Sequence, residues 1–435
     1  MRIIKLIFLS CFLSTFFVST AVCQWTRVME YYGNILCFHT YSNAPARVDI
    51  FAGTNGGGVL FSNDYGTSWI VKGLTDTSVL CFASNEVGAN IFAGTNGQGV
   101  KRSDNYGATW TTYNNGLTTE DGKTVRAIVT TPNGLGGINV FAGTDEGVFF
   151  SSNYGESWIN KDLIYVNALA ISDYGIGGAR LYASSIGNGI FTSSDNGASW
   201  TKISNGVPYG TIWPIALSIN ESGDTTLFAS CPLDYIYRST NNGANWTLID
   251  NNNGLKNSLV QAFAICPDAP ENIFAGTGGG GVFLSTDNGT NWTEVNTNLT
   301  STNVRSLIIT SDGAGGKYLF AGTINGGIWR RPLADMITSV QVSKKDIPKT
   351  FKLFQNYPNP FNPRTTIHFL LPSKSHVTLR VYDILGQELE TLINEEREAG
   401  MYILQYDGLN LTSGIYFYRL QAGSYSETKK LILLK

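Results

Sequence analysis

A short pattern, S-x-[DN]-x-G-x-x-W, occurs six times in the sequence and constrains the fold more than any other feature. The six copies, termed boxes here, begin at residues 62, 103, 151, 193, 239 and 285. Their third position carries Asp64, Asn105, Asn153, Asp195, Asn241 and Asp287. An amide cannot replace a carboxylate as a general acid, whereas Asn and Asp both hydrogen bond to nearby backbone in turns. We therefore interpret the boxes as structural turns rather than as catalytic or metal sites.

A second pattern, a strand of the type "IFAGT", precedes each box and occurs a seventh time without one. Its aromatic residues are 41, 49, 41, 46, 46 and 46 residues apart, at Phe51, Phe92, Phe141, Tyr182, Phe228, Phe274 and Phe320. A strand with the pattern V-x-A-[FIL] comes before it, and the Trp of each box begins another strand. Four strands in a repeat of roughly 40 to 50 residues are typical of a propeller blade. The sequence therefore predicts an all-β fold, a seven-bladed β-propeller over residues 24–333.

The seventh repeat lacks its fourth strand, because it stops at "GGIWRRPL" (326–333). Near the N-terminus, "QWTRV" (24–28) resembles the strands "SWTKI", "NWTLI" and "NWTEV" that follow boxes four, five and six. We predict that Trp25 to Val28 complete the last blade and join the two ends of the ring. Such closure removes exposed sheet edges.

Residues 1–23 have the pattern of a secretory signal peptide: Arg2 and Lys5, an apolar run ending near Val18, then the small-residue stretch "STAVC". A lipoprotein signal is the alternative, although Val22 stands where such signals have a smaller residue. No later apolar run approaches the roughly 18 to 20 residues that span a bilayer, so we predict no membrane span in the mature chain.

Four cysteines remain after residue 23. Cys37 and Cys81 occupy one repeat position, which the other repeats fill with Ala or Ser, so we interpret them as small core residues. Cys231 and Cys266 fall on adjacent repeats and are the plausible disulfide pair in an exported protein. Whether they pair stays open from the sequence.

Together the boxes and blades resemble the Asp-box, or BNR-repeat, propellers. This group includes sialidases, xyloglucan-type glycoside hydrolases, sortilin-like receptors and photosystem assembly factors. The resemblance covers about residues 24–333 and implies the fold, but such a fold supports many functions.

After a polar stretch at 334–349, interpreted as a linker, the chain changes to alternating apolar strands with Pro and Gly turns. This pattern predicts a small immunoglobulin-like β-sandwich over 350–435. "NYPNPFNP" (356–363), "VYDILG", "SGIYFYRL" and the basic-apolar C-terminus resemble the type IX secretion C-terminal sorting domain. The resemblance implies that the type IX machinery of a Gram-negative bacterium recognises residues 350–435. The chain would then pass through the periplasm to the medium or the outer cell surface. An accessory domain without sorting activity is the alternative.

Several catalytic patterns are missing from the sequence. His39 is the only histidine between residues 24 and 333, so a His-built metal site is not expected. There is no G-x-S-x-G elbow and no Arg-Ile-Pro motif of the sialidase type. We predict no cofactor and no metal. Residues 24–333 carry 16 basic and 23 acidic side chains, a net charge of −7, which argues against nucleic-acid binding.

A binding face is what the propeller sequence predicts instead. Loops between second and third strands, and between blades, are expected on the face opposite the boxes, and they carry Tyr31, Tyr32, Tyr165, Tyr209, Trp213 and Tyr235. Arg126 and Arg305 take matching positions on innermost strands and are predicted to point toward the channel mouth. Aromatic platforms suit sugars or peptide segments. We therefore predict a non-catalytic binding or adhesion protein with a glycan or protein ligand, and a purely structural surface protein is a further possibility.

A secreted glycoside hydrolase is the alternative function. The acids predicted on the same face are Asp76, Glu120, Asp121, Asp145, Glu146, Asp162 and Asp234. Any two of them could stand at the separation that a glycosidase requires. The sequence does not measure that separation.

Overall fold

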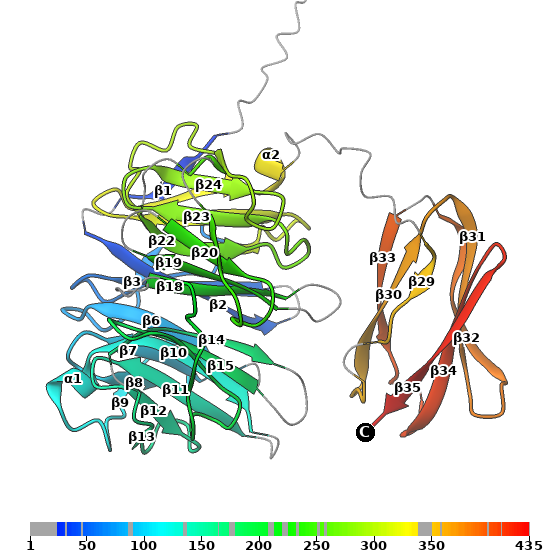
Figure 1. Ribbon diagram of the computed structural model, residues 1–435, viewed down its shortest axis with the longest axis horizontal. Helices are drawn as coiled ribbons and strands as arrows, with labels where there is room; N and C mark the ends of the chain where they lie inside the picture. The colour runs from blue at the N-terminus through cyan, green and yellow to red at the C-terminus, as the bar shows by residue number, and fades with distance from the viewer. Residues whose placement is uncertain are drawn as a thin grey trace, which may run out of the picture. The chain divides into compact units, whose positions relative to one another are not determined.

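The computed structural model describes residues 24–435, with gaps at 31–32, 45–46, 86–89, 134–136, 164, 174–178, 208–212, 220–224, 232–234, 250–252, 256–258, 338–349, 357–358, 398–399, 410 and 435. The chain divides into two compact units, Met1–Ile337 and Thr338–Lys435. Figure 1 shows both units, coloured by residue number. The predicted signal peptide, residues 1–23, lies outside the described residues.

The described residues of the first unit form seven four-stranded sheets, which are the blades of a propeller (Figure 1). Blade one contains β2–β5, and the blades follow in chain order to blade seven, which contains β26–β28 and β1. The first strand of each blade packs against the first strands of both neighbours, and β2 packs against β26. This last contact closes the ring. The predicted seven-bladed fold is therefore confirmed.

The strands have the following bounds. The first strands are β2 (Ile35–Ala44), β6 (Val79–Ser84), β10 (Val125–Pro132), β14 (Val166–Asp173), β18 (Trp213–Ile219), β22 (Val260–Ile265) and β26 (Val304–Ser311). The second strands are β3 (Arg47–Thr54), β7 (Ile91–Thr95), β11 (Ile138–Thr144), β15 (Ala179–Ser185), β19 (Thr225–Cys231), β23 (Ile273–Thr277) and β27 (Lys317–Thr323).

The outer half of each blade is shorter. The third strands are β4 (Val59–Ser62), β8 (Val100–Ser103), β12 (Val148–Ser151), β16 (Gly189–Ser193), β20 (Tyr235–Ser239), β24 (Gly281–Ser285) and β28 (Ile328–Pro332). The fourth strands are β5 (Ile70–Val71), β9 (Thr111–Thr112), β13 (Ile159–Asn160), β17 (Thr201–Lys202), β21 (Thr247–Ile249), β25 (Thr293–Glu294) and, for blade seven, β1 (Thr26–Met29).

Strand β1 closes the ring as the sequence predicts. It pairs antiparallel with β28, with Thr26 opposite Arg330 and Arg27 opposite Trp329. Trp25, just before β1, is fully buried between blades six and seven. Its indole Nε1 donates a hydrogen bond to the Val295 carbonyl oxygen over 2.7 Å. Trp25 and strand β1 therefore tie the last blade to the blade before it.

The six boxes are turns held by one repeated set of hydrogen bonds. In every box the Ser hydroxyl donates to the Asp or Asn Oδ1 over 2.7–2.9 Å and accepts from the box Gly N–H over 2.8–2.9 Å. The same Oδ1 accepts from the backbone N–H four residues on, over 2.8–3.1 Å. Carboxylate and amide oxygens serve equally in this role, which explains why Asp and Asn alternate there.

Hydrogen bonds from the turn lower the pKa of the box carboxylates. Burial raises the pKa of Asp64, but hydrogen bonds from Ser68, Ser62 and Thr67 outweigh it and hold the pKa at about 2. Hydrogen bonds from Ser199 and Ser193 lower the pKa of Asp195 to about 2 as well. A carboxyl group with so low a pKa is a poor proton donor at neutral pH.

Each blade packs on the next through the second-strand aromatics, all fully buried: Phe51, Phe92, Phe141, Tyr182, Phe228, Phe274 and Phe320. In four of the boxes, at Gly66, Gly107, Gly155 and Gly289, the box Gly lies against such a ring. Gly66 of blade one has φ of +74°, and a Cβ added there would lie 2.3 Å from the Phe320 ring of blade seven. Glycine is therefore required both for the backbone conformation and for the close approach of two blades.

Three third-strand arginines cross from one blade to the next. Their Nη1 atoms donate to the backbone carbonyl just before the box Gly of the following blade: Arg102 to Tyr154 over 2.7 Å, Arg238 to Asn288 over 2.8 Å and Arg330 to Tyr65 over 3.1 Å. All three arginines pair across the sheet with a second-strand Phe. These contacts, termed arginine clasps here, join blades two to three, five to six and seven to one.

Replacing Arg102 should lower the free energy of unfolding more than replacing its neighbour Lys101. Arg102→Met leaves the Tyr154 carbonyl without its charged donor, so we expect the free energy of unfolding to fall by about 1–3 kcal/mol. Lys101→Met is the matched control, because Lys101 donates only within its own blade, to Thr112. Its exposed bond should be worth less than about 0.5 kcal/mol. Urea unfolding checks both values, and equal losses would contradict an inter-blade role.

The first unit ends with helix α2 (Ala334–Ile337), whose Met336 is buried in the propeller core with Trp25 and Trp329. The propeller unit thus extends four residues into the range that the sequence assigns to the linker. Cys231 and Cys266 are buried free thiols and do not form the disulfide considered from the sequence. Burial raises the pKa of Cys231 to about 11.

The second unit is a β-sandwich of two sheets. One contains β29 (Lys352–Leu353), β30 (Arg364–Leu371) and β33 (Gly400–Asp407), and the other contains β31 (Ser375–Tyr382), β32 (Glu388–Arg397), β34 (Gly414–Ala422) and β35 (Tyr425–Leu433). Alternate side chains of β31, β34 and β35 are buried between the sheets. This is the sandwich predicted from the alternating strands.

The "NYPNPFNP" segment is held against the last strand of the sandwich. The Ile432 N–H donates to Asn359 Oδ1 over 2.8 Å, and the Phe361 N–H donates to the Ile432 carbonyl over 2.9 Å. Asn356 is buried, and its backbone N–H donates to the Tyr418 hydroxyl over 2.7 Å. The segment is therefore part of the sandwich and fixes the position of the chain terminus.

Candidate functional site

Every first strand carries a β-bulge near its start. The register shifts at one residue in each blade: Leu36, Leu80, Arg126, Asn167, Pro214, Gln261 and Arg305. All seven line one cavity of about 290 Å³. A bulge re-aims the side chain of the extra residue, and Pro can occupy one because it needs no ladder hydrogen bond. The bulges thus bring one side chain from each blade into the channel.

This cavity lies toward the face opposite the boxes. The bulges are at the starts of the first strands, which pair with the ends of the second strands, as Val125 does with Thr144. The loops between second and third strands are at that end, whereas the boxes follow the third strands at the other end. We name the end with the bulges the channel face and the other the box face.

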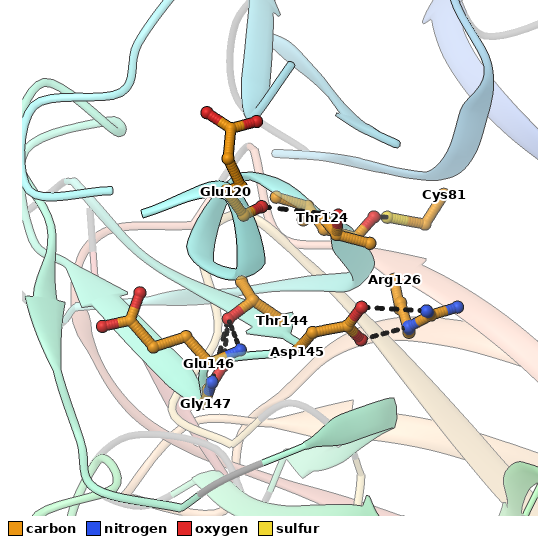
Figure 2. A network of polar contacts seen from close by, with 9 residues as sticks. Cys81, Glu120, Thr124, Arg126, Thr144, Asp145, Glu146 and Gly147 are labelled. Carbon is orange, nitrogen blue, oxygen red and sulfur yellow. Dashed lines mark hydrogen bonds and ion pairs between the residues drawn. The ribbon is translucent and has the colours of Figure 1, made fainter. Parts of the chain in front are cut away.

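Two arginines of the ring give the cavity its charge. The Arg126 guanidinium meets the Asp145 carboxylate with two contacts, from Nε to Oδ1 and from Nη2 to Oδ2, the second over 2.9 Å (Figure 2). Arg305 lines the same cavity. Burial, and then the like charge of Arg126, lower the pKa of Arg305. Asp145 balances the charge of Arg126.

Two further loop acids, Glu120 and Glu146, lie near Asp145 (Figure 2). Helix α1 (Glu120–Lys123) is capped by Thr119, whose hydroxyl accepts from the Gly122 N–H and contacts Glu146 Oε2. Glu120 pairs with Lys123 over 3.1 Å. The Glu120 carboxylate is therefore paired within its own loop, and the Glu146 carboxylate is contacted by Thr119 from the connection between blades two and three.

The other predicted acids are spread over several turns. Asp76 and Asp162 have positive φ values of 63° and 60° in the turns that follow fourth strands. Asp121 lies within α1, and Asp234 is outside the described residues.

The predicted aromatic residues are only partly described. Tyr165 is 49% exposed in the turn before β14, and its carbonyl accepts from the Ile186 N–H at the channel face. Trp213 starts β18 and Tyr235 starts β20, which places their backbones at the same end of blade five. Tyr31, Tyr32 and Tyr209 lie outside the described residues.

Five ring residues are missing from the set predicted from the sequence: Leu36, Leu80, Asn167, Pro214 and Gln261. A signal exists for four of them, since Leu36, Leu80, Asn167 and Gln261 follow the Val or Ile that begins the first-strand pattern, as Arg126 and Arg305 follow a Val, whereas Pro214 follows Trp213. The regular in-and-out alternation expected of a strand does not predict that these residues face the channel, because a bulge shifts the side-chain direction by one residue.

Histidine and metal chemistry find little support in the described part of the chain. His39 is in hydrogen-bond contact with Ser84 Oγ over 2.8 Å, and burial lowers its pKa to about 4. Among the described residues, no group of three His, Cys, Asp or Glu side chains is placed to hold a metal ion. No described helix is long and apolar enough to cross a membrane.

Comparison with solved structures shows a shared fold at low sequence identity. YCF48 from Cyanidioschyzon merolae is 14% identical with a TM-score of 0.52, over 71% of this chain and 98% of that chain. YCF48 bound to D1 peptide is 15% identical with a TM-score of 0.54, over 72% of this chain and 96% of that chain. The GH74 xyloglucanase from Xanthomonas campestris is 15% identical with a TM-score of 0.55, and the match covers 80% of this chain but 59% of the xyloglucanase. Comparison with curated proteins finds no match.

The second unit is similar to a known family in sequence. Residues 355–434 match the model described as a secretion system C-terminal sorting domain. This range contains the "NYPNPFNP" segment and six of the seven strands of the sandwich. The chain is therefore a seven-bladed β-propeller that carries a type IX secretion C-terminal sorting domain and is secreted or attached to the outer cell surface.

Proposed function

We propose that the propeller is a non-catalytic binding or adhesion module, and that its ligand, a glycan or a partner protein, binds at the channel face. The observation that carries this proposal is the ring of seven bulge residues around one cavity. Ligand sites are usually concave, with apolar walls and a few converging polar groups. The ring has that composition, since Leu36 and Leu80 lie beside two arginines and the amide of Gln261.

The charges of the ring favour a ligand group rich in oxygen acceptors. Arg126 already binds Asp145 with both ends of its guanidinium, whereas the pKa of Arg305 is lowered by burial and by Arg126. A carboxylate or carbonyl entering the cavity would offset the repulsion between the two guanidinium groups. Both acidic polysaccharides and peptide segments offer such groups. One similar structure is that of YCF48 bound to D1 peptide, which is compatible with a protein ligand for this fold.

The type IX machinery is the second proposed partner, and it would recognise residues 350–435 rather than the propeller. Export does not require the channel face. The two partners can therefore be tested separately.

Ligand retention tests the binding proposal. The mature chain is passed over immobilised xyloglucan, xylan, cellulose, pectin and alginate, and reducing ends are measured in the same samples. We expect retention on at least one polymer without release of reducing ends. Arg305→Gln should weaken retention by about tenfold, because a charge-assisted hydrogen bond is worth about 1.5–3 kcal/mol. Arg27→Gln is the matched control, since Arg27 is on β1 and pairs with Glu30 at the surface.

The glycoside hydrolase alternative predicts a different result. Release of reducing ends that Glu120→Gln or Glu146→Gln abolishes would replace the binding proposal with catalysis at the α1 loop. Retention that is equal in Arg305→Gln and in the control would contradict the channel cavity as the ligand site.

A further inference from the structure

Four blades have no arginine at the clasp position: blades one, three and six carry Phe61, Phe150 and Leu284 there, and blade four carries the much shorter Thr192. The third-strand residue opposite the second-strand aromatic is Arg102 in blade two, Arg238 in blade five and Arg330 in blade seven. In blade four this residue is Thr192, opposite Tyr182. The Thr192 hydroxyl donates within its own blade, to the Leu181 carbonyl over 2.9 Å. Its short side chain cannot reach the box of blade five.

Beside the short side chain of Thr192, a pocket of about 330 Å³ lies between blades four and five on the box face. Thr192, Ser199 and Thr201 of blade four line it, together with Asn241 and Asn242 of the blade-five box. Asn242 is the residue before the box Gly, the position whose carbonyl the clasps use in other blades. The volume is within the range of small-molecule sites, about 300–1,000 Å³.

The pocket also contains a positively charged side chain, that of Arg180. Arg180, near the start of β15, lines the pocket, and its buried Nε has no hydrogen-bond partner among the described side chains. No carboxylate is found among the described residues that line the pocket. Asp195, in the box of blade four, is already hydrogen bonded by Ser193 and Ser199. A buried guanidinium nitrogen without a partner is costly, and a bound anionic group would satisfy it.

A spare amide donor lies beside this arginine. Asn241 uses its Oδ1 within the box, where it accepts from Ser239 Oγ and from the Asn245 N–H, both over 2.9 Å. The Nδ2 groups of Asn105 and Asn153 donate within their own boxes. The Asn241 Nδ2 has no such partner among the described residues, so it can donate to a ligand.

We propose that this inter-blade pocket binds an acidic sugar, with Arg180 holding its anionic group and Asn241 and the surrounding hydroxyls meeting its hydroxyl groups. A guanidinium pairs with a carboxylate or a sulfate through two parallel hydrogen bonds. Amide and hydroxyl side chains offer the donors and acceptors that sugar hydroxyls need. The site is on the box face and is independent of the proposed ligand at the channel face.

Titration of the full mature chain with D-glucuronate, D-glucose and inorganic sulfate tests this site. Calorimetry gives the Kd, and saturation-transfer NMR reports which ligand protons touch the protein. We expect glucuronate to bind and glucose to bind at least about tenfold more weakly, because glucose lacks the anionic group. Glucose binding equal to that of glucuronate, or sulfate binding without glucuronate, would overturn the assignment to an acidic sugar.

Two variants test whether the ligand binds in this pocket, one by removing its charge and the other by filling its space. Arg180→Gln removes the charge, and Thr192→Arg fills the pocket with a side chain that can reach the Asn242 carbonyl as the other clasps do. Each should weaken glucuronate binding by about tenfold. Thr192→Arg should not lower the Tm, so its loss of binding cannot result from unfolding. Arg27→Gln, which removes a surface charge on β1 outside both cavities, is the control and should leave the Kd unchanged. Loss of binding in Arg305→Gln with normal binding in Arg180→Gln would overturn the proposal.

Discussion

Replacing Trp25 by alanine is expected to lower the free energy of unfolding of the propeller by about 3–5 kcal/mol, the usual cost of removing a buried tryptophan. Trp25 is fully buried among apolar side chains of blades six and seven. Its backbone N–H donates to the Thr297 carbonyl over 2.9 Å, and its carbonyl accepts from Asn298 Nδ2 over 2.9 Å. The substitution therefore loosens the point at which the N-terminal strand closes the ring.

Tryptophan fluorescence during urea unfolding measures this effect, because all nine tryptophans lie in the propeller and none in the sorting domain. Arg27→Ala is the matched control on the same strand, since its side chain is exposed, and we expect a change of less than about 0.5 kcal/mol. If Trp25→Ala unfolds at the same urea concentration as the control, β1 does not act as the closing strand.

The fold could be predicted from the sequence because its turn chemistry repeats. Six boxes of one pattern and seven buried aromatic strands indicate the number of blades, and the odd strand at 24–28 indicates how the ring closes. The resemblance of 356–363 and the later strands to a known family indicates the second unit. Each of these signals is local, so no knowledge of the neighbouring blades is needed to detect it.

The cavities could not be predicted in the same way, because they depend on contacts between blades. Arg126 and Arg305 can be predicted from their matching positions, but the other members of the ring require the bulges, which only the strand register reveals. The pocket beside Arg180 depends on the short side chain of Thr192. In the sequence Thr192 looks like an ordinary strand residue, and only the register shows that it occupies the position from which an arginine would reach the next box.

A second prediction concerns export, and it depends on the structure of the sorting domain. Its terminal strand is held on one side by β34 and at its end by the "NYPNPFNP" segment, where the Leu434 N–H donates to the Phe361 carbonyl over 3.0 Å. Leu431 and Leu433 of this strand are fully buried in the sandwich core. Strand β35 is therefore an ordered part of the sandwich, held on both sides along its C-terminal half.

Deleting residues 350–435 should strand most of the propeller in the periplasm, because the domain that matches the sorting family is lost while the propeller remains a separate compact unit. Cell fractionation and immunoblotting of the medium, outer surface and periplasm measure the distribution. An unchanged Tm of the truncated propeller is the control for folding, and fusing 338–435 to an unrelated periplasmic protein should carry that protein to the surface. A truncated propeller that still reaches the medium would mean that residues outside the sandwich carry the export signal.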